Sequence, residues 1–234
     1  MTNFRTCLTG MKLALMASPL PAHEPDFDAR IRDYILNNPE IIVEALEVLS
    51  QREAQTALVR KLTQFPDLFT RAPVLGLGDP AAPVRVVELF DYRCTPCKAA
   101  HPQLKALVAA NPQLRIEMRH LPILSPGSER AARFALAVLE LYGPDRYAAV
   151  HARLWTQKGP LNTAGFAQIA EQEALDIGAV EAAMDAPWIN DRINANRDLA
   201  IALDIRGTPA FISQNSVAVG ASDLRALAEG WLRN

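Results

Sequence analysis

The sequence predicts an α/β fold with an inserted helical domain and an N-terminal helical arm. Three observations lead to this fold class. An apolar, strand-like run from Val84 to Phe90 leads into a Cys-x-x-Cys motif and then into a helix-like stretch. A long segment, residues 127–203, has helical periodicity almost throughout, and an apolar strand follows it. Amphipathic helices precede both features, between residues 26 and 64.

The composition is that of one compact domain with an extension. The chain has 234 residues and is 50% hydrophobic, which is enough to bury a sizeable core. Its net charge of −2 lacks the excess positive charge that binds the phosphates of nucleic acid, so no nucleic-acid partner is expected. No run approaches the roughly 20 apolar residues that span a bilayer.

Residues 1–22 have the features of a weak secretory signal peptide. Arg5 and Lys12 precede a short apolar run, Leu13 to Leu20, which ends just before Ala22. The alternative is a disordered cytosolic tail. Export is the favoured interpretation, because the Cys-x-x-Cys motif, if it acts as an oxidising dithiol, needs an oxidising compartment.

Residues 23–72 are expected to form a helical arm and a linker. Asn38-Pro39-Glu40 is a helix start signal, with Asn as N-cap, Pro at the first helical position and an acid in the first turn. Ile42, Leu46 and Leu49 then fall on one face. An apolar stripe outside a complete fold must be covered, so the arm is predicted to mediate self-association. The alternative is that the arm packs on its own domain.

Cys94 and Cys97 are the strongest candidate functional residues. The predicted strand before them and the helix after them place Cys94 at a helix N-terminus, where free N–H groups and the helix dipole stabilise a thiolate. The two-residue spacing lets the second thiol reach back and resolve a mixed disulfide. The pattern indicates thiol–disulfide exchange.

The cysteine pair has two other interpretations. A Cys-x-x-Cys can be half of a zinc site, with His101 and His120 as third and fourth ligands, but the downstream Cys/His pair of a zinc finger is missing. The pair can also form a purely structural disulfide. No metal is therefore predicted.

Two prolines strengthen the redox interpretation. Pro102 lies inside the predicted helix, five residues after Cys97, where it would kink the helix. Far downstream, a Gly207-Thr208-Pro209 turn enters an apolar strand, and a proline before a strand is a candidate cis peptide.

Taken together, these features resemble the thioredoxin superfamily, in which a cis-proline loop faces the dithiol. The helical insertion is similar to that of the DsbA-like branch, and the resemblance extends from about Asp26 onward. It identifies residues 73–234 as a DsbA-like thioredoxin domain with a helical insertion at about 127–203. Within that branch three further segments resemble the ScsC-type proteins: Phe90-Asp91-Tyr92, Leu121-Pro122-Ile123-Leu124 and Ala195-Asn196-Arg197.

The resemblance implies roles for the residues around the cysteines. Thr208 and Pro209 form the loop that binds substrate. Glu88 stands where DsbA-like proteins bury an acid beneath the active site, and such an acid shuttles protons to the second cysteine; the alternative is a solvated strand glutamate. Thr95 and Pro96 tune the dithiol, and they depart from the proline-first pair of DsbA itself. No cofactor is implied.

The function implied is that of a periplasmic thiol–disulfide oxidoreductase, an oxidase if monomeric and an isomerase or reductase if oligomeric. Its partners would be protein substrates with thiols or disulfides, and a membrane redox partner that reduces or oxidises the dithiol. ScsC-type proteins trimerise through a helical arm, which favours a homotrimer here. The alternative function is sequestration of soft metal ions, because paired thiolates select Cu(I). The predicted cis-proline favours the first function, since metal sequestration needs no substrate-docking backbone edge.

Overall fold

The computed structural model describes residues 25–69 and 75–233, with side chains described from Phe27 onward. The chain divides into two units, Met1–Gln51 and Arg52–Asn234. The predicted signal peptide, residues 1–22, lies outside the described residues. Among the helices of the described part, none combines the length and the apolar character that crossing a bilayer requires.

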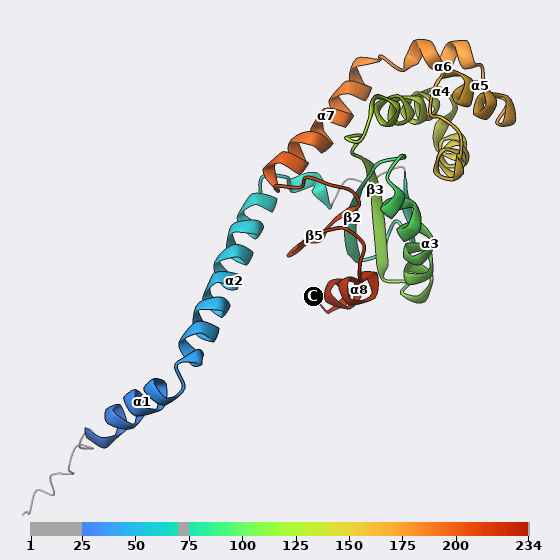
Figure 1. Cartoon of the computed structure of the whole chain (residues 1–234). Coiled ribbons are helices and arrows are strands. Elements are labelled where there is room, and N and C mark those ends of the chain that lie inside the picture. The colour runs from blue at the N-terminus through green and yellow to red at the C-terminus, as the bar shows by residue number, and fades with distance from the viewer. Residues whose placement is uncertain (1–24, 70–74, 234) are drawn as a thin grey trace, which may run out of the picture. The chain divides into compact units, whose positions relative to one another are not determined.

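The elements drawn in Figure 1 confirm the predicted α/β class. The strand predicted from Val84 to Phe90 is β2, and the start signal around Asn38 directly precedes α2. The elements follow one another in the order α1 (Pro25–Asn37), α2 (Glu40–Leu62), η1 (Pro66–Leu68), β1 (Gly76–Leu77), β2 (Val84–Phe90), α3 (Thr95–Ala110), β3 (Leu114–His120), α4 (Pro126–Thr156), α5 (Thr163–Gln172), α6 (Ile177–Ala183), α7 (Pro187–Ala202), β4 (Ala210–Ile212), β5 (Val217–Val219) and α8 (Leu224–Leu232).

The strands form one sheet in the order β1-β3-β2-β4-β5. The central strand β2 pairs in parallel with β3, from Val84 opposite Leu114 to Phe90 opposite His120, and α3 makes the crossover between them. The pairings of β1 with β3, of β4 with β2 and of β5 with β4 are antiparallel. This topology places the carboxyl end of β2 at the start of the loop that carries Cys94.

Each face of the sheet is covered by helices, so both are buried. Val86 packs with side chains of α3 and α8, whereas Val87 and Leu89 pack with side chains of α7 and with Leu62 at the end of α2. Because successive side chains of a strand point to opposite faces, Glu88 shares the α3 face with Val86 and Phe90. The central strand therefore presents an acid to the underside of the helix that begins at the cysteines.

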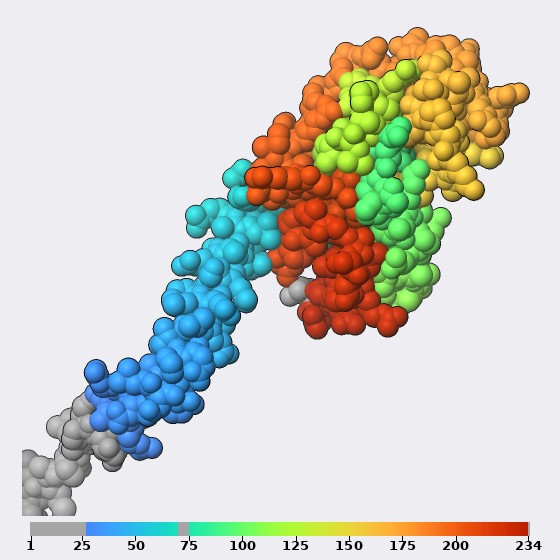
Figure 2. Space-filling model, in the orientation of Figure 1, coloured from blue at the N-terminus to red at the C-terminus, as the bar shows by residue number. Residues whose placement is uncertain are grey.

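The segment between β3 and β4 folds as an additional helical layer. Its helices pack into one core with Phe90, Cys94 and Cys97, and in Figure 2 the yellow and orange atoms of residues 145–185 gather in one lobe. Helix α4 is interrupted at Gly143, whose φ of 80° favours glycine, and Pro144 follows it.

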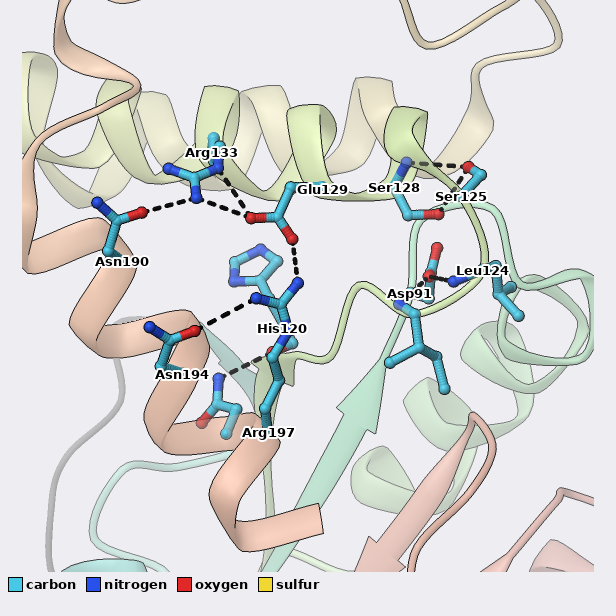
Figure 3. Close-up of polar contacts among 12 residues, drawn as sticks. Asp91, His120, Leu124, Ser125, Ser128, Glu129, Arg133, Asn190, Asn194 and Arg197 are labelled. Atoms are coloured by element: carbon cyan, nitrogen blue, oxygen red, sulfur yellow. Dashed lines mark hydrogen bonds and ion pairs between the residues drawn. The ribbon is translucent and has the colours of Figure 1, made fainter. Parts of the chain in front are cut away.

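Polar contacts join α4 to α7 across this layer. Figure 3 shows Glu129 of α4 between Arg133, on its own helix, and Arg197 of α7. Arg133 also donates to Asn190 of α7, with its Nη2 2.6 Å from Oδ1. These contacts orient α7, whose other side covers the sheet.

Candidate functional site

The two cysteines form a disulfide at the N-terminus of α3. Their Cα atoms are 5.2 Å apart. Cys94 is the N-cap residue, in an extended conformation, and its Sγ accepts the backbone N–H of Cys97 over 3.0 Å. Because first-turn N–H groups have no helical acceptor, they would stabilise negative charge on this sulfur after reduction.

The exposure of the motif is uneven. Cys97 is fully buried and Cys94 retains 2% of its surface, whereas Thr95 and Pro96 between them are exposed. Thr95 and Pro96 therefore form the exposed surface next to the buried disulfide.

The fold brings the Thr208-Pro209 loop directly to the first cysteine. The peptide bond between Thr208 and Pro209 is cis, which confirms the prediction. The Sγ atom of Cys94 lies 3.2 Å from the carbonyl oxygen of Thr208, a residue 114 positions later in the chain. The Cys94 sulfur therefore lies beside the Thr208-Pro209 backbone that leads into β4. An extended peptide could pair with this backbone while one of its residues contacts the sulfur.

Glu88 is buried completely, and neither of its carboxylate oxygens has a hydrogen-bond partner in the protein. This burial raises the pKa of Glu88 to about 8. The alternative of a solvated strand glutamate is wrong, because the side chain lies under α3 between Val86 and Phe90. An acid with this pKa can gain or lose a proton near neutral pH.

Asp91 anchors the loop that precedes Cys94. Its carboxylate accepts the backbone N–H groups of Arg93 (2.7 Å), Ile123 (3.0 Å) and Leu124 (3.1 Å). Figure 3 shows the contact with Leu124. The loop after β2 is thereby joined to the loop after β3, and the side chains of Ile123 and Leu124 remain exposed.

Replacing Asp91 with alanine is expected to lower the free energy of unfolding by about 2–3 kcal/mol, because three backbone N–H groups lose a charged acceptor. Urea denaturation would measure this loss. Asp79→Ala is the matched control, since the carboxylate of the exposed Asp79 accepts one backbone N–H, that of Ala81, over 2.8 Å. Equal losses in the two variants would contradict the anchoring role.

Sequence reasoning missed a set of rings that lies behind the dithiol. Tyr92, His120 and His151 are buried and hydrogen-bonded to one another, and Trp155 stacks on His151. Of these residues the sequence suggests only His120 as a site residue, and only as a zinc ligand. The sequence spacing of these residues gives no sign of a cluster. They come from segments far apart in the sequence: the ends of β2 and β3 and the second half of α4.

The described residues do not bring the considered zinc ligands together. Within 25–69 and 75–233, no group of three or more His, Cys, Asp or Glu side chains is placed to hold a metal ion. His101 instead faces the rings of His151 and Trp155, with centroid distances of 6.0 and 5.0 Å.

Comparison with family models divides the chain into two matched parts. Residues 85–230 match the model of the DSBA-like thioredoxin domain. Residues 24–56 match that of the copper resistance protein ScsC N-terminal domain. The two matches fall on the predicted thioredoxin domain and the predicted arm.

Solved structures show the same architecture. The thiol-disulfide exchange protein alpha-DsbA2 from Wolbachia pipientis is 28% identical, with a TM-score of 0.67 over 77% of this chain and 97% of that protein. A thioredoxin-like oxidoreductase from Silicibacter pomeroyi is 34% identical, with a TM-score of 0.62 over 68% and 90%. Proteus mirabilis ScsC in a compact conformation is 26% identical, with a TM-score of 0.63 over 89% and 98%.

The chain is also similar to part of a much longer curated protein. It is 28% identical over 153 residues to the Na(+)/H(+) antiporter NhaA 3 of Salinispora tropica. The match covers 64% of this chain, which spans only 23% of the antiporter's length.

Proposed function

Because this chain belongs to the family of DSBA-like thioredoxin domains, we propose that it is a thiol–disulfide oxidoreductase that exchanges disulfides in exported proteins. The observation that carries the proposal is the meeting of Cys94, at the N-terminus of α3, with the carbonyl group of Thr208, 3.2 Å from its sulfur. A thiolate site and a backbone edge for an extended peptide lie together there.

In this proposal Cys94 exchanges with the substrate and Cys97 resolves. A substrate thiolate attacks Sγ of Cys94, the Cys94–Cys97 bond breaks, and Cys97 leaves as a thiolate that takes up a proton. A second substrate thiolate then attacks the substrate sulfur of the mixed disulfide, which releases an oxidised substrate and the Cys94 thiolate. In the reverse direction Cys97 loses its proton and attacks Cys94.

Five neighbouring residues assist this exchange. Glu88, under α3, exchanges the proton with Cys97, because its raised pKa lets it act as acid or base near neutral pH. Thr95 and Pro96 separate the two sulfurs at the surface, and they set how strongly α3 favours the thiolate over the disulfide. Substrate backbone pairs beside Thr208 and Pro209.

The reduction potential of the Cys94/Cys97 couple is the decisive measurement. A potential near about −120 mV, as in DsbA, would support an oxidase, and one near about −180 mV, as in protein disulfide isomerase, would support an isomerase. A protein that neither equilibrates with glutathione nor forms mixed disulfides would contradict the proposal.

We extend the proposal to the domains and their locations. Residues 1–22 serve as a signal peptide, residues 23–72 as an oligomerisation arm and linker, and residues 73–234 as the catalytic domain in the periplasm. A membrane protein that reduces or oxidises the dithiol is the redox partner. The match of residues 24–56 to the ScsC N-terminal domain model supports a separate function for the arm.

Exposed apolar side chains support assembly through the arm. Nine large apolar residues of α1 and of the first half of α2 are exposed, at 40–64% of their surface: Phe27, Ile31, Tyr34, Leu36, Ile42, Val43, Leu46, Val48 and Leu49. Such a concentration of apolar surface is characteristic of a protein–protein interface. Homotrimerisation through residues 23–72 would cover it.

Deleting residues 23–51 is expected to convert a homo-oligomer into a folded monomer, because the deletion removes this apolar surface but retains Leu58 and Leu62, which pack with the catalytic domain. The monomer should keep its glutathione reactivity and lose isomerase activity on scrambled ribonuclease. Sedimentation velocity gives the assembly state. The control variant Glu44→Gln/Glu47→Gln changes two exposed acids of α2, removes no apolar surface and should stay oligomeric. A full-length protein that is itself monomeric would contradict the arm's role.

The soft-metal alternative uses the same cysteines. When reduced, Cys94 and Cys97 offer two thiolates, which suits Cu(I). Competition of the reduced protein with a Cu(I) chelator distinguishes the alternatives: binding that survives Cys94→Ala would exclude these thiolates as the copper site.

A further inference from the structure

A chain of hydrogen bonds begins two residues before Cys94. The hydroxyl of Tyr92 lies 3.0 Å from Nδ1 of His151 and 3.3 Å from Nε2 of His120. Nε2 of His120 lies in turn 3.4 Å from the hydroxyl of Tyr147. All four side chains are at least 95% buried, so the chain is shielded from water and its bonds are strengthened accordingly.

Three ring nitrogens at one end of this chain have no protein partner: Nδ1 of His101, Nε2 of His151 and Nε1 of Trp155. Their rings are mutual neighbours, with centroids 6.0 Å apart for His101 and His151, 5.0 Å for His101 and Trp155, and 5.1 Å for His151 and Trp155. His151 and Trp155 are 5% and 6% exposed. An unsatisfied buried nitrogen costs about 1–3 kcal/mol, so three of them on adjacent rings call for a shared polar partner.

Donors and acceptors among these nitrogens balance around one water molecule. If Tyr92 donates to Nδ1 of His151, the proton of His151 is on Nε2, and His151 and Trp155 present two donors. Nδ1 of His101 is then an acceptor, provided its proton is on Nε2. A water molecule has two lone pairs and two hydrogens, so it accepts both donors and donates to His101. In the opposite arrangement Nδ1 of His151 donates to the Tyr92 hydroxyl, and Nε2 of His151 is an acceptor. The same water then donates to both histidines and accepts from Trp155.

The histidines are suited to this role because they are uncharged. Burial, together with nearby His101 and Lys105, lowers the pKa of His151 to about 3. Burial and Lys105 lower the pKa of His101 to about 4. Burial, His151 and Arg192 lower the pKa of His120. Each ring therefore offers one donor and one acceptor at neutral pH.

Tyr92 connects this cluster to the nucleophile. It lies within the tight turn closed by the bond from the N–H of Cys94 to the carbonyl group of Asp91, over 3.0 Å. The turn sets the direction in which Cys94 enters α3 as N-cap. A bond that holds the Tyr92 hydroxyl therefore holds the backbone that aims the Cys94 sulfur at the first-turn N–H groups.

We propose that His151 is a positioning residue for Cys94, acting through Tyr92, and that a single buried water molecule between His101, His151 and Trp155 completes its hydrogen bonds. Loss of this support lets the turn move, weakens the stabilisation of the Cys94 thiolate and makes the couple more reducing. The inference rests on the proposed redox role of Cys94.

The test compares glutathione equilibrium constants in the full-length protein. Tyr92→Phe and His151→Phe keep the aromatic packing and remove the polar atoms. Each is expected to shift the constant at least threefold toward the disulfide, and the double variant should shift it no further than the larger single change, because both disrupt one unit. The pH profile of Cys94 alkylation should move to higher pH in the same variants. Tyr142→Phe is the matched control, because its hydroxyl accepts the backbone N–H of Asp176 and takes no part in the hydrogen bonds of His151.

Unshifted constants in the single variants, or additive shifts in the double variant, would overturn the positioning role. Trp155→Phe removes one donor to the water and should shift the constant in the same direction, without adding to His151→Phe. A crystal structure with no ordered water among the three rings would overturn the water site. If the wild-type protein fails to equilibrate with glutathione at all, the proposed function fails instead, so the two failures are distinguishable.

Discussion

Replacing Cys94 with alanine is expected to reduce disulfide exchange about a thousandfold or more, because the nucleophile itself is removed. Replacing Cys97 with alanine should also stop turnover, but for a different reason. Cys94 still forms a mixed disulfide, but the variant has lost the Cys97 thiol that resolves it from within the active site. Cys97→Ala protein should therefore accumulate as covalent adducts with its substrates.

Mass spectrometry of reducible adducts separates the two outcomes. The contrast in exposure supports the assignment, since Cys94 retains 2% of its surface and Cys97 none. Both alanine variants lack the disulfide, so each is the other's control for stability. Adducts on Cys97 in the Cys94→Ala variant, and none on Cys94 in the Cys97→Ala variant, would show that the roles are reversed.

Local patterns were sufficient to predict the parts of the fold that carry the cysteines. The run from Val84 to Phe90 is apolar at five of its seven positions, on both faces of the strand, because β2 is the central strand and helices cover both faces of the sheet. The spacing of the cysteines and the helical periodicity after them placed Cys94 at the start of α3. The cis bond before Pro209 also followed from a residue type with few conformational options.

Other features depend on contacts that no local pattern encodes. The strand β1 has only two residues, and it forms because Gly76 and Leu77 meet the edge of β3. The cluster around His151 arises where α4 crosses the ends of β2 and β3, so its members are scattered in the sequence. Glu88 was predicted by resemblance, but its complete burial and lack of partners follow from the packing of α3 on the sheet.

Replacing Glu88 with glutamine is expected to stabilise the protein at neutral and alkaline pH. The folded-state pKa of Glu88 is about 8, above its ordinary value of 4.5. The folded protein therefore retains a proton that the unfolded chain releases, and stability falls as pH rises from 4.5 to 8. The slope is about 1.4 kcal/mol per pH unit, so the loss amounts to a few kcal/mol by pH 8. Glutamine carries no such proton, and the variant is spared this loss.

Urea denaturation of both proteins at pH 4.5, 6 and 8 measures the difference. It should be small at pH 4.5 and grow to about 2–4 kcal/mol at pH 8 in favour of the variant. The buried histidines destabilise both proteins below their ordinary pKa of 6.5, so their contribution cancels in the difference. Glu44→Gln, at an exposed position of α2, is the charge-matched control and should show no such trend.

Glu88→Gln should stabilise the protein but slow the resolution of the mixed disulfide. Cys97 must lose a proton to attack the mixed disulfide, and glutamine cannot accept one, so release of a trapped substrate should slow by about 100-fold. Quenched-flow measurement of mixed-disulfide decay gives this rate, while formation of the adduct at Cys94 should be unchanged. A stabilised variant that releases substrate at the wild-type rate would mean that Glu88 does not exchange the proton with Cys97. A variant that is neither stabilised nor slowed would mean that the carboxyl group is ionised and solvated, and that its burial under α3 does not persist in solution.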